Sequence, residues 1–381
     1  MDIDAPIRLL GGISPAAFMR RHWQKKPLLV RQALPGVQPP LARGALFDLA
    51  ASGDVESRLV VHRSVPDHPG HGWSVRHGPL PRRALPPLRQ PGWTLLVQGL
   101  DLHLAAAHEM LSRFRFVPDA RLDDLMMSWA SDGGGVGPHL DSYDVFLIQV
   151  QGRRRWRVGR VADAAFVDGV PLKILRHFEP EHEWLLEPGD MLYLPPMWGH
   201  DGVAEGECAT CSVGFRAPDR DALGRELLMR LGDVDDDERA AAHPYRDPRQ
   251  PATRTPGALP EALQVFARDA VQRLLDEPLA LERALGEVFT EPKPKVWFEA
   301  GRARRPGEGL VLDARTRVAY DARFVFINGE SFRAAGRDAG LMHQLADGRA
   351  LTAAATARLS AGALALVDDW VASGWLHGGS A

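Results

Sequence analysis

The run Val145-Phe-Leu-Ile-Gln-Val150 heads a series of short segments rich in Val, Ile, Phe, Tyr and Trp, separated by Gly and Pro turns. The other segments are Arg155 to Val158, Met191 to Leu194 and Cys211 to Phe215. Many short strands at this spacing are typical of an antiparallel sandwich or barrel. The region from Leu125 to Phe215 therefore predicts a mostly β fold of the jelly-roll kind, a double-stranded β-helix.

The segments before this region predict a mixed N-terminal part. Ser14-Pro15 has the form of an N-cap and first-turn proline, which indicates a helix ending near Trp23 to Pro27. From Pro39 to Pro91 the chain is rich in proline, and we expect mostly loops with short strands there.

The composition changes after Ala217-Pro218, where apolar residues recur at helical spacing. The predicted helices are Arg220 to Leu231, Pro260 to Leu275 and Pro278 to Phe289. Further on, Asn328-Gly329 separates Phe324 to Ile327 from Glu330 to Arg333, which is a strong hairpin signal. Helices from Leu341 and from Ser360 to Ser373 follow, so the end of the chain predicts a winged helix or another small α+β module.

Length and composition predict a folded protein of two or three domains. The chain has 381 residues, 45% hydrophobic and 25% charged. A formal net charge of −3 gives no general attraction to nucleic acid phosphates, so nucleic acid binding is not expected. Two cysteines are too few for a disulfide framework, and neither a signal-peptide pattern nor a membrane-spanning apolar run occurs. We expect a soluble cytoplasmic protein with no membrane partner.

The segment Gly133-Gly-Gly-Val-Gly-Pro-His-Leu-Asp141 carries the clearest chemical signal. On a strand, His139 and Asp141 project from one face and can reach one ion. His200 ends a second strand-like segment, and a jelly roll brings distant strands side by side. Two imidazoles and a carboxylate with open positions suit a non-haem Fe(II) oxygenase. The alternative is two ordinary histidines, but the preceding glycines favour close approach of a ligand.

A candidate anion-binding residue follows in the series Arg153, Arg154 and Arg155. In extended structure Arg154 faces opposite to its two neighbours. A single arginine inside a barrel requires an anion, because a buried unpaired charge is very costly. The alternative, a solvated basic turn, suits Arg153 and Arg155.

Four motifs resemble one known family. They are Gly-Gly-Gly-Val-Gly-Pro-His-Leu-Asp-x-Tyr-Asp-Val-Phe, Gly-Arg-Arg-Arg-Trp-Arg-Val, Pro-Gly-Asp-Met-Leu-Tyr-Leu-Pro-Pro and Ser-Val-Gly-Phe-Arg-Ala-Pro, all between Leu125 and Pro218. They resemble the bacterial JmjC-type ribosomal oxygenases, a cupin-like group of 2-oxoglutarate oxygenases. The founding activity of that group is arginine hydroxylation on large-subunit ribosomal protein sixteen.

The resemblance implies a role for each motif residue. His139, Asp141 and His200 would bind Fe(II), and Arg154 would pair with the distal carboxylate of 2-oxoglutarate, with dioxygen as the second cosubstrate. Ser212 would add a hydrogen bond, although it reads equally well as a plain strand hydroxyl.

The resemblance also implies three regions and a substrate. Residues 1–218 would form the JmjC/cupin-like catalytic domain, 219–289 a helical dimerisation region giving a homodimer, and 290–381 a winged-helix-like domain that need not bind nucleic acid. The substrate would be an arginine side chain of a large-subunit ribosomal protein, hydroxylated at Cβ.

A guanidinium substrate calls for an acidic or aromatic approach to the metal. Tyr143, Asp132, Met126 and Ser128 lie in suitable segments, although each is equally plausible as packing or loop structure. Two other function classes remain open. One is a JmjC hydroxylase or demethylase of another protein, and the other is a non-catalytic winged-helix and cupin adaptor that binds nucleic acid.

Overall fold

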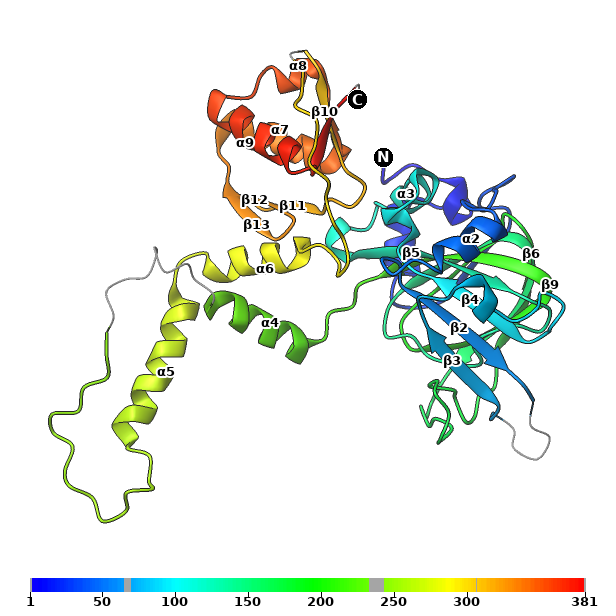
Figure 1. Cartoon of the computed structure of the whole chain (residues 1–381), viewed down its shortest axis with the longest axis horizontal. Coiled ribbons are helices and arrows are strands. Elements are labelled where there is room, and N and C mark those ends of the chain that lie inside the picture. Colours follow the sequence, from blue (N-terminus) through cyan, green and yellow to red (C-terminus); the bar gives the residue numbers. More distant parts are fainter. Residues whose placement is uncertain (1, 65–69, 233–242, 306, 380–381) are drawn as a thin grey trace. The chain divides into compact units, whose positions relative to one another are not determined.

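The computed structural model describes residues 2–64, 70–232, 243–305 and 307–379. The chain divides into two compact units. The first is Met1–Ala217 with Pro294–Trp297, and the second is Pro218–Lys293 with Phe298–Ala381. Figure 1 shows the large sheet of the first unit in blue to green, and the helices and small sheets of the second in green to red.

The first unit is built around an antiparallel sheet of nine strands in the order β1-β8-β6-β9-β5-β4-β2-β3, with β7 paired to β6. The strands are β1 (Leu28–Val30), β2 (Ser57–His62), β3 (Trp73–His77), β4 (Trp93–Val97), β5 (Leu122–Ala130), β6 (Val145–Arg160), β7 (His182–Leu186), β8 (Met191–Leu194) and β9 (Trp198–Phe215). Neighbours far apart in sequence, such as β6 and β9, lie side by side, which confirms the predicted mostly β jelly-roll class.

Short helices cover the rim of this sheet. They are α1 (Pro15–Arg21), α2 (Arg43–Leu49) and α3 (Ala105–Ser112), with 3-10 turns η1 (Arg8–Leu10), η2 (Arg82–Ala84), η3 (Leu100–Leu102) and η4 (Asp119–Arg121). The predicted N-cap of α1 is confirmed, because the Ser14 hydroxyl accepts a hydrogen bond from the Ala17 amide at 3.2 Å.

The two faces of the sheet have different chemistry. In β5, Leu125, Met127 and Trp129 point into the main hydrophobic core. Met126 and Ser128, the alternate residues, point into a cavity on the opposite face. Alternate residues of β5 therefore have different roles: one set packs in the core and stabilises the fold, and the other set faces the cavity and is available for chemistry.

Strand β6 differs from the sequence expectation, which divided it into Val145 to Val150 and Arg155 to Val158. It is one strand of 16 residues, interrupted by irregular register between Gln149 and Arg153. Gly152 lies there with φ of 63°, a conformation that glycine adopts without strain. A glycine inside a strand thus marks a bulge rather than the end of the strand.

The proline-rich stretch was also only partly predicted. Loops with short strands were expected from Pro39 to Pro91, but the structure contains α2 there, and β2 and β3 extend the main sheet. Strand β2 pairs with both β3 and β4, so this stretch contributes to one wall of the cavity.

The second unit begins with α4 (Arg220–Gly232), α5 (Glu261–Asp276) and α6 (Ala280–Thr290), near the predicted helices. Its C-terminal part contains β10 (Gly309–Leu312), β11 (Val318–Tyr320), β12 (Phe324–Ile327), β13 (Glu330–Arg333), α7 (Gly336–Gly348), β14 (Ala350–Leu351), α8 (Ala353–Thr356), α9 (Ala361–Ala372) and β15 (Leu376–Gly379). The predicted hairpin is confirmed, with Asn328 at φ 48° and Gly329 at φ 88° between β12 and β13.

Two three-stranded sheets, β14-β10-β15 and β11-β12-β13, pack with α7 and α9 around one core in this unit. Among the described residues, no helix has the length and apolar character needed to cross a membrane.

Candidate metal and cosubstrate site

Three side chains from two separate segments of the first unit converge at the cavity. The backbones of His139 and His200 form reciprocal hydrogen bonds, each amide donating to the other carbonyl at 3.0 Å. Nε2 of His200 lies 3.5 Å from Asp141 Oδ2, and Nε2 of His139 lies 4.0 Å from Asp141 Oδ1. The ligand atoms of all three residues lie within 4.8 Å of one another, so one ion can contact all three.

Backbone carbonyls orient both imidazoles. His139 Nδ1 lies 2.8 Å from the Gly137 carbonyl oxygen, and His200 Nδ1 lies 3.0 Å from that of Trp198. Because a carbonyl oxygen only accepts, each Nδ1 carries the proton and each Nε2 keeps its lone pair. Both Nε2 atoms are therefore prepared as metal ligands, in the arrangement that outer hydrogen bonds impose at metal sites.

Electrostatics favours the neutral form of His200. Burial, together with the nearby His139, lowers the pKa of His200 to about 4, although Asp141 opposes this effect. The imidazole of His200 is therefore neutral at pH 7, as metal ligation requires. Among the described residues, these three form the single cluster of His, Cys, Asp or Glu with such spacing.

Arg154 points into the same cavity from β6 and is 5% exposed. Its Nη1 donates to the Ser128 hydroxyl at 3.3 Å, whereas Nε and Nη2 are buried without a hydrogen-bond partner in the described part of the chain. Its neighbours Arg153 and Arg155 point outward and form ion pairs with glutamates. A buried guanidinium with two orphan donors fits an anionic ligand, because without one its burial is very costly.

The cavity has a volume of about 490 Å³ and contains most of the predicted residues. The triad and Arg154 line it together with Met126, Ser128, Tyr143 and Ser212. Asp132 does not line it. Its side chain is on the exterior, where Oδ1 accepts a hydrogen bond from the Gly206 amide at 2.8 Å. The substrate role suggested for Asp132 is therefore not supported, because its carboxylate caps a loop outside the cavity.

Four charged residues that line the cavity were missed by the sequence analysis: Arg58, Asp123, Asp124 and Lys173. Asp124 of β5 is 7% exposed, and Oδ2 accepts a hydrogen bond from the Gly99 amide at 2.9 Å. It occupies the strand face of Met126 and Ser128, so strand parity could have identified it. Arg58 of β2 also lines the cavity. The irregular sequence around β2 offered no comparable signal.

Tyr143 links Asp124 to the metal ligands. The ring is partly exposed, but burial of its hydroxyl raises the tyrosine pKa, and Asp141 and Asp124 raise it further. Tyr143 therefore remains a protonated hydrogen-bond donor beside Asp141 at physiological pH.

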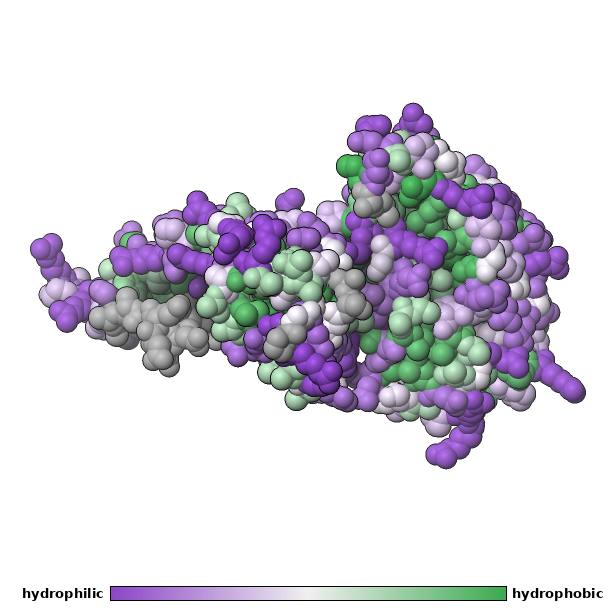
Figure 2. All heavy atoms as spheres, turned by 90° about the horizontal axis from the view of Figure 1, so that it is seen from above, coloured by the Kyte–Doolittle hydropathy of each residue, from purple (hydrophilic) through white to green (hydrophobic). Residues whose placement is uncertain are grey.

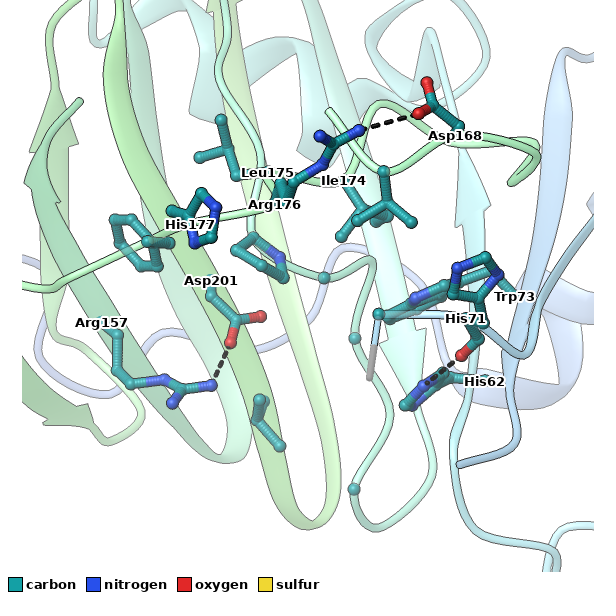
Figure 3. A pocket seen from close by; sticks show the side chains of 18 residues that line it. His62, His71, Trp73, Arg157, Asp168, Ile174, Leu175, Arg176, His177 and Asp201 are labelled. Atoms are coloured by element: carbon teal, nitrogen blue, oxygen red, sulfur yellow. Dashed lines mark hydrogen bonds and ion pairs between the residues drawn. The ribbon is translucent and has the colours of Figure 1, made fainter. Parts of the chain in front are cut away.

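A second pocket, of about 880 Å³, lies on the outer side of the glycine-rich segment before His139 (Figure 3). Figure 3 shows the ion pair of Arg157 and Asp201 on one side and the stacked rings of His62 and Trp73 on the other. A side chain at Gly137 would collide with Trp73 and Ile174. The glycine at position 137 thus allows the ligand segment to pack closely against Trp73 and Ile174.

Comparison with known proteins agrees with this geometry. Residues 109–223 match the family model described as a JmjC domain, and residues 267–377 match the ROXA-like winged helix. The chain is 34% identical over 348 residues to the ribosomal protein uL16 3-hydroxylase of Escherichia coli strain K12, covering 88% of this chain and 89% of the relative. The chain belongs to the JmjC-type ribosomal oxygenases.

Solved structures extend the similarity of this ribosomal oxygenase over nearly its full length. The crystal structure of Escherichia coli YcfD has a TM-score of 0.79 and 33% identity, covering 95% of this chain and 97% of that chain. YcfD in complex with cobalt and 2-oxoglutarate has a TM-score of 0.76 and 32% identity, with the same coverage. The fold and its family are therefore shown over both units.

The ribosomal oxygenase uses Fe(II), 2-oxoglutarate and dioxygen, as its family does. Its own residues fit these groups. Two Nε2 atoms and a carboxylate would hold the iron, and the orphan donors of Arg154 would hold a carboxylate within the same cavity.

Proposed function

We propose that this enzyme hydroxylates Cβ of an arginine side chain in a large-subunit ribosomal protein. One observation carries the proposal: a metal triad, an anion site and the buried carboxylate of Asp124 line one cavity in a chain related to a uL16 3-hydroxylase over 88% of its length. Acidic oxygens suit a guanidinium, because a fork of N–H donors pairs with carboxylates.

The proposal gives each residue of the metal side a role. His139, Asp141 and His200 hold Fe(II), and Arg154 holds the distal carboxylate of 2-oxoglutarate through donors that have no other partner among the described residues. Ser212, which lies on β9 in the same cavity, adds a hydrogen bond to the cosubstrate. When bound, iron and 2-oxoglutarate supply the oxidising power for C–H hydroxylation.

On the substrate side, Asp124 and Tyr143 receive the guanidinium of the substrate arginine, and Met126 packs against its aliphatic part. Oδ2 of Asp124 accepts a hydrogen bond from the Gly99 amide, and a carboxylate has about four lone-pair sites, so it can accept from several donors. The apolar cavity residues Leu96, Leu147 and Val145 reduce the access of water to the reacting carbon.

The proposal also includes the domain organisation expected from the sequence. Residues 1–218 form the catalytic domain, 219–289 a dimerisation region and 290–381 the winged-helix-like domain. Helix α5 supports dimerisation, because none of its residues is buried although Val265, Phe266, Val271 and Leu275 are large and apolar. In Figure 2, apolar side chains reach the surface over this helical segment. A ribosomal-protein substrate implies a cytoplasmic enzyme.

The decisive experiment incubates the purified enzyme with Fe(II), 2-oxoglutarate, oxygen and uL16. We expect succinate to form and the ribosomal protein to gain the mass of one oxygen atom, which fragmentation locates at Cβ of an arginine. His139→Ala should abolish both products, because one of the three ligands is lost. A gain on another residue or protein, or loss of a methyl group, would move the enzyme to a different JmjC reaction. No product from any protein would favour the adaptor.

Asp124→Asn and Asp132→Asn form a matched pair for substrate recognition. Asp124 lines the cavity and Asp132 does not. We expect Asp124→Asn to raise KM for uL16 by about 10-fold or more, since a charge-assisted hydrogen bond contributes roughly 1.5–3 kcal/mol. Asp132→Asn should leave KM near its original value. Equal effects of the two substitutions would contradict the proposed guanidinium site.

A further inference from the structure

Arg58 is a second guanidinium in the catalytic cavity. It lies on β2, with Leu96 of β4 opposite on one side and His77 of β3 on the other. Its Nε is buried and has no hydrogen-bond partner, and no ion pair to Arg58 exists in the described ranges. A half-buried cation without a partner is unfavourable, so its retention requires an explanation.

The cosubstrate does not explain Arg58. The strand register places Arg58 opposite Leu96, and Leu96 opposite Ser128, whose hydroxyl contacts Arg154. Two strand spacings, roughly 10 Å, therefore separate the backbone of Arg58 from that of Ser128. The two carboxylates of 2-oxoglutarate are already assigned, one to the metal and one to Arg154, and neither remains for Arg58.

Arg58 instead lies on the substrate side of the metal. It lines the cavity together with Asp124, Met126 and Tyr143, the residues proposed to receive the substrate arginine. A substrate guanidinium directed at Asp124 would thus enter near a fixed positive charge. Two guanidinium ions in contact repel each other, so the substrate guanidinium itself does not contact Arg58. The part of the substrate that contacts Arg58 must instead be an oxygen acceptor.

We infer that Arg58 binds an oxygen acceptor of the protein substrate, a main-chain carbonyl or an acidic side chain next to the hydroxylated residue. This inference rests on the proposed function. Asp124 and Tyr143 hold the end of the target side chain, while Arg58 holds the adjoining part of the substrate. Contacts at two points fix the position of Cβ at the metal, where a small displacement costs much of the rate.

The test compares Arg58→Gln and Arg58→Ala with Arg63→Ala. Arg63 follows the same strand, is exposed and does not line the cavity, so it controls for loss of one positive charge. We expect Arg58→Ala to raise KM for uL16 by about 10- to 100-fold, the equivalent of roughly 1.5–3 kcal/mol for a hydrogen bond to a charged group. Any rise in KM for 2-oxoglutarate should be at least about 10-fold smaller. Arg63→Ala should match the original enzyme.

A binding measurement separates recognition from turnover. Titration calorimetry of uL16 into the Co(II)- and 2-oxoglutarate-loaded enzyme should show the same loss of affinity in Arg58→Ala, while thermal unfolding stays near that of the original enzyme. If Arg58→Gln restores most of the affinity, the acceptor is a carbonyl. If it does not, and if KM of the original enzyme rises steeply with salt, the acceptor is a carboxylate.

Two results have distinct meanings. Equal KM and affinity for Arg58→Ala and the original enzyme would overturn the inference, with the proposed function intact. Failure of the original enzyme to hydroxylate uL16 would instead overturn the proposed function, and with it the inference.

Discussion

Arg154 is the residue whose environment is hardest to explain without a ligand. Its Nε and Nη2 have no partners among the described residues, and its nearest neighbours in sequence face outward. We expect Arg154→Ala to raise KM for 2-oxoglutarate by about 10- to 100-fold, because it removes charge-assisted hydrogen bonds worth roughly 1.5–3 kcal/mol. Steady-state succinate production at varied 2-oxoglutarate measures the effect.

Arg153→Ala is the control for this substitution. Arg153 is 55% exposed, and its closest acidic partner, Glu205, lies 3.9 Å away. Exposed pairs of this kind contribute little, so KM for 2-oxoglutarate should not change. Similar values of KM for the two variants would remove Arg154 from the cosubstrate site.

Side chains placed by a short local spacing could be predicted from sequence, whereas side chains placed by the pairing of distant strands could not. The period of two selected His139, Asp141 and the inward-facing Arg154, although His139 forms only an isolated bridge and Asp141 lies outside the named strands. His200 depended on a strand pairing between distant segments, which only the fold class could suggest. Arg58 was missed because its position depends on the register of β2, and nothing in a proline-rich stretch reveals that register.

The bulge in β6 determines which arginine faces the cavity. A side chain at Gly152 would collide with the backbone of Glu207 and Cys208 on β9, and its φ of 63° disfavours other residues. We expect Gly152→Ala to lower the free energy of unfolding by at least about 2 kcal/mol through strain and steric conflict. Because the register beyond the bulge would change, KM for 2-oxoglutarate should rise as well. Urea unfolding and steady-state kinetics measure both effects.

Gly206→Ala provides the matched comparison. Gly206 also has a positive φ, 73°, but nothing lies within 4 Å of an added Cβ. In this variant the free energy of unfolding should fall by only about 1 kcal/mol, because alanine adopts this backbone conformation less readily than glycine. KM for 2-oxoglutarate should not change. If Gly152→Ala proved no more destabilised than Gly206→Ala, the close packing of β6 on β9 would not be what fixes the bulge.

Local turn chemistry made some elements easier to predict than others. The Asn328-Gly329 hairpin and the Ser14 cap each depend on two or three adjacent residues. The length of β6 depends instead on pairing with β7, β8 and β9, which are distant in sequence. The prediction of two separate strands was therefore wrong. The sequence of β6 shows the glycine of the bulge, but it does not show the strands that pair with β6 on both sides of the bulge.

For the whole molecule, the exposed apolar side of α5 leads to a prediction about assembly. Val271 is 49% exposed, and α5 has no buried residues. We expect Val271→Asp to weaken dimerisation by about 10- to 100-fold, because an aspartate in an apolar interface loses its hydration. Gln272→Asp introduces the same charge on an adjacent, polar position and should leave the dimer intact. Light scattering over a dilution series measures the mass, and a monomeric original protein would contradict the dimer.

The reciprocal amide-to-carbonyl pair between His139 and His200 has a consequence for how the enzyme acquires its ion. These backbone hydrogen bonds fix the spacing of the two histidine ligands. The metal site is therefore preorganised, and little conformational entropy is lost when the ion binds. We therefore expect the protein to fold without the ion, because this backbone pairing does not include the metal. A cell short of iron would then accumulate intact, dormant copies of the enzyme, ready to become active when the supply returns.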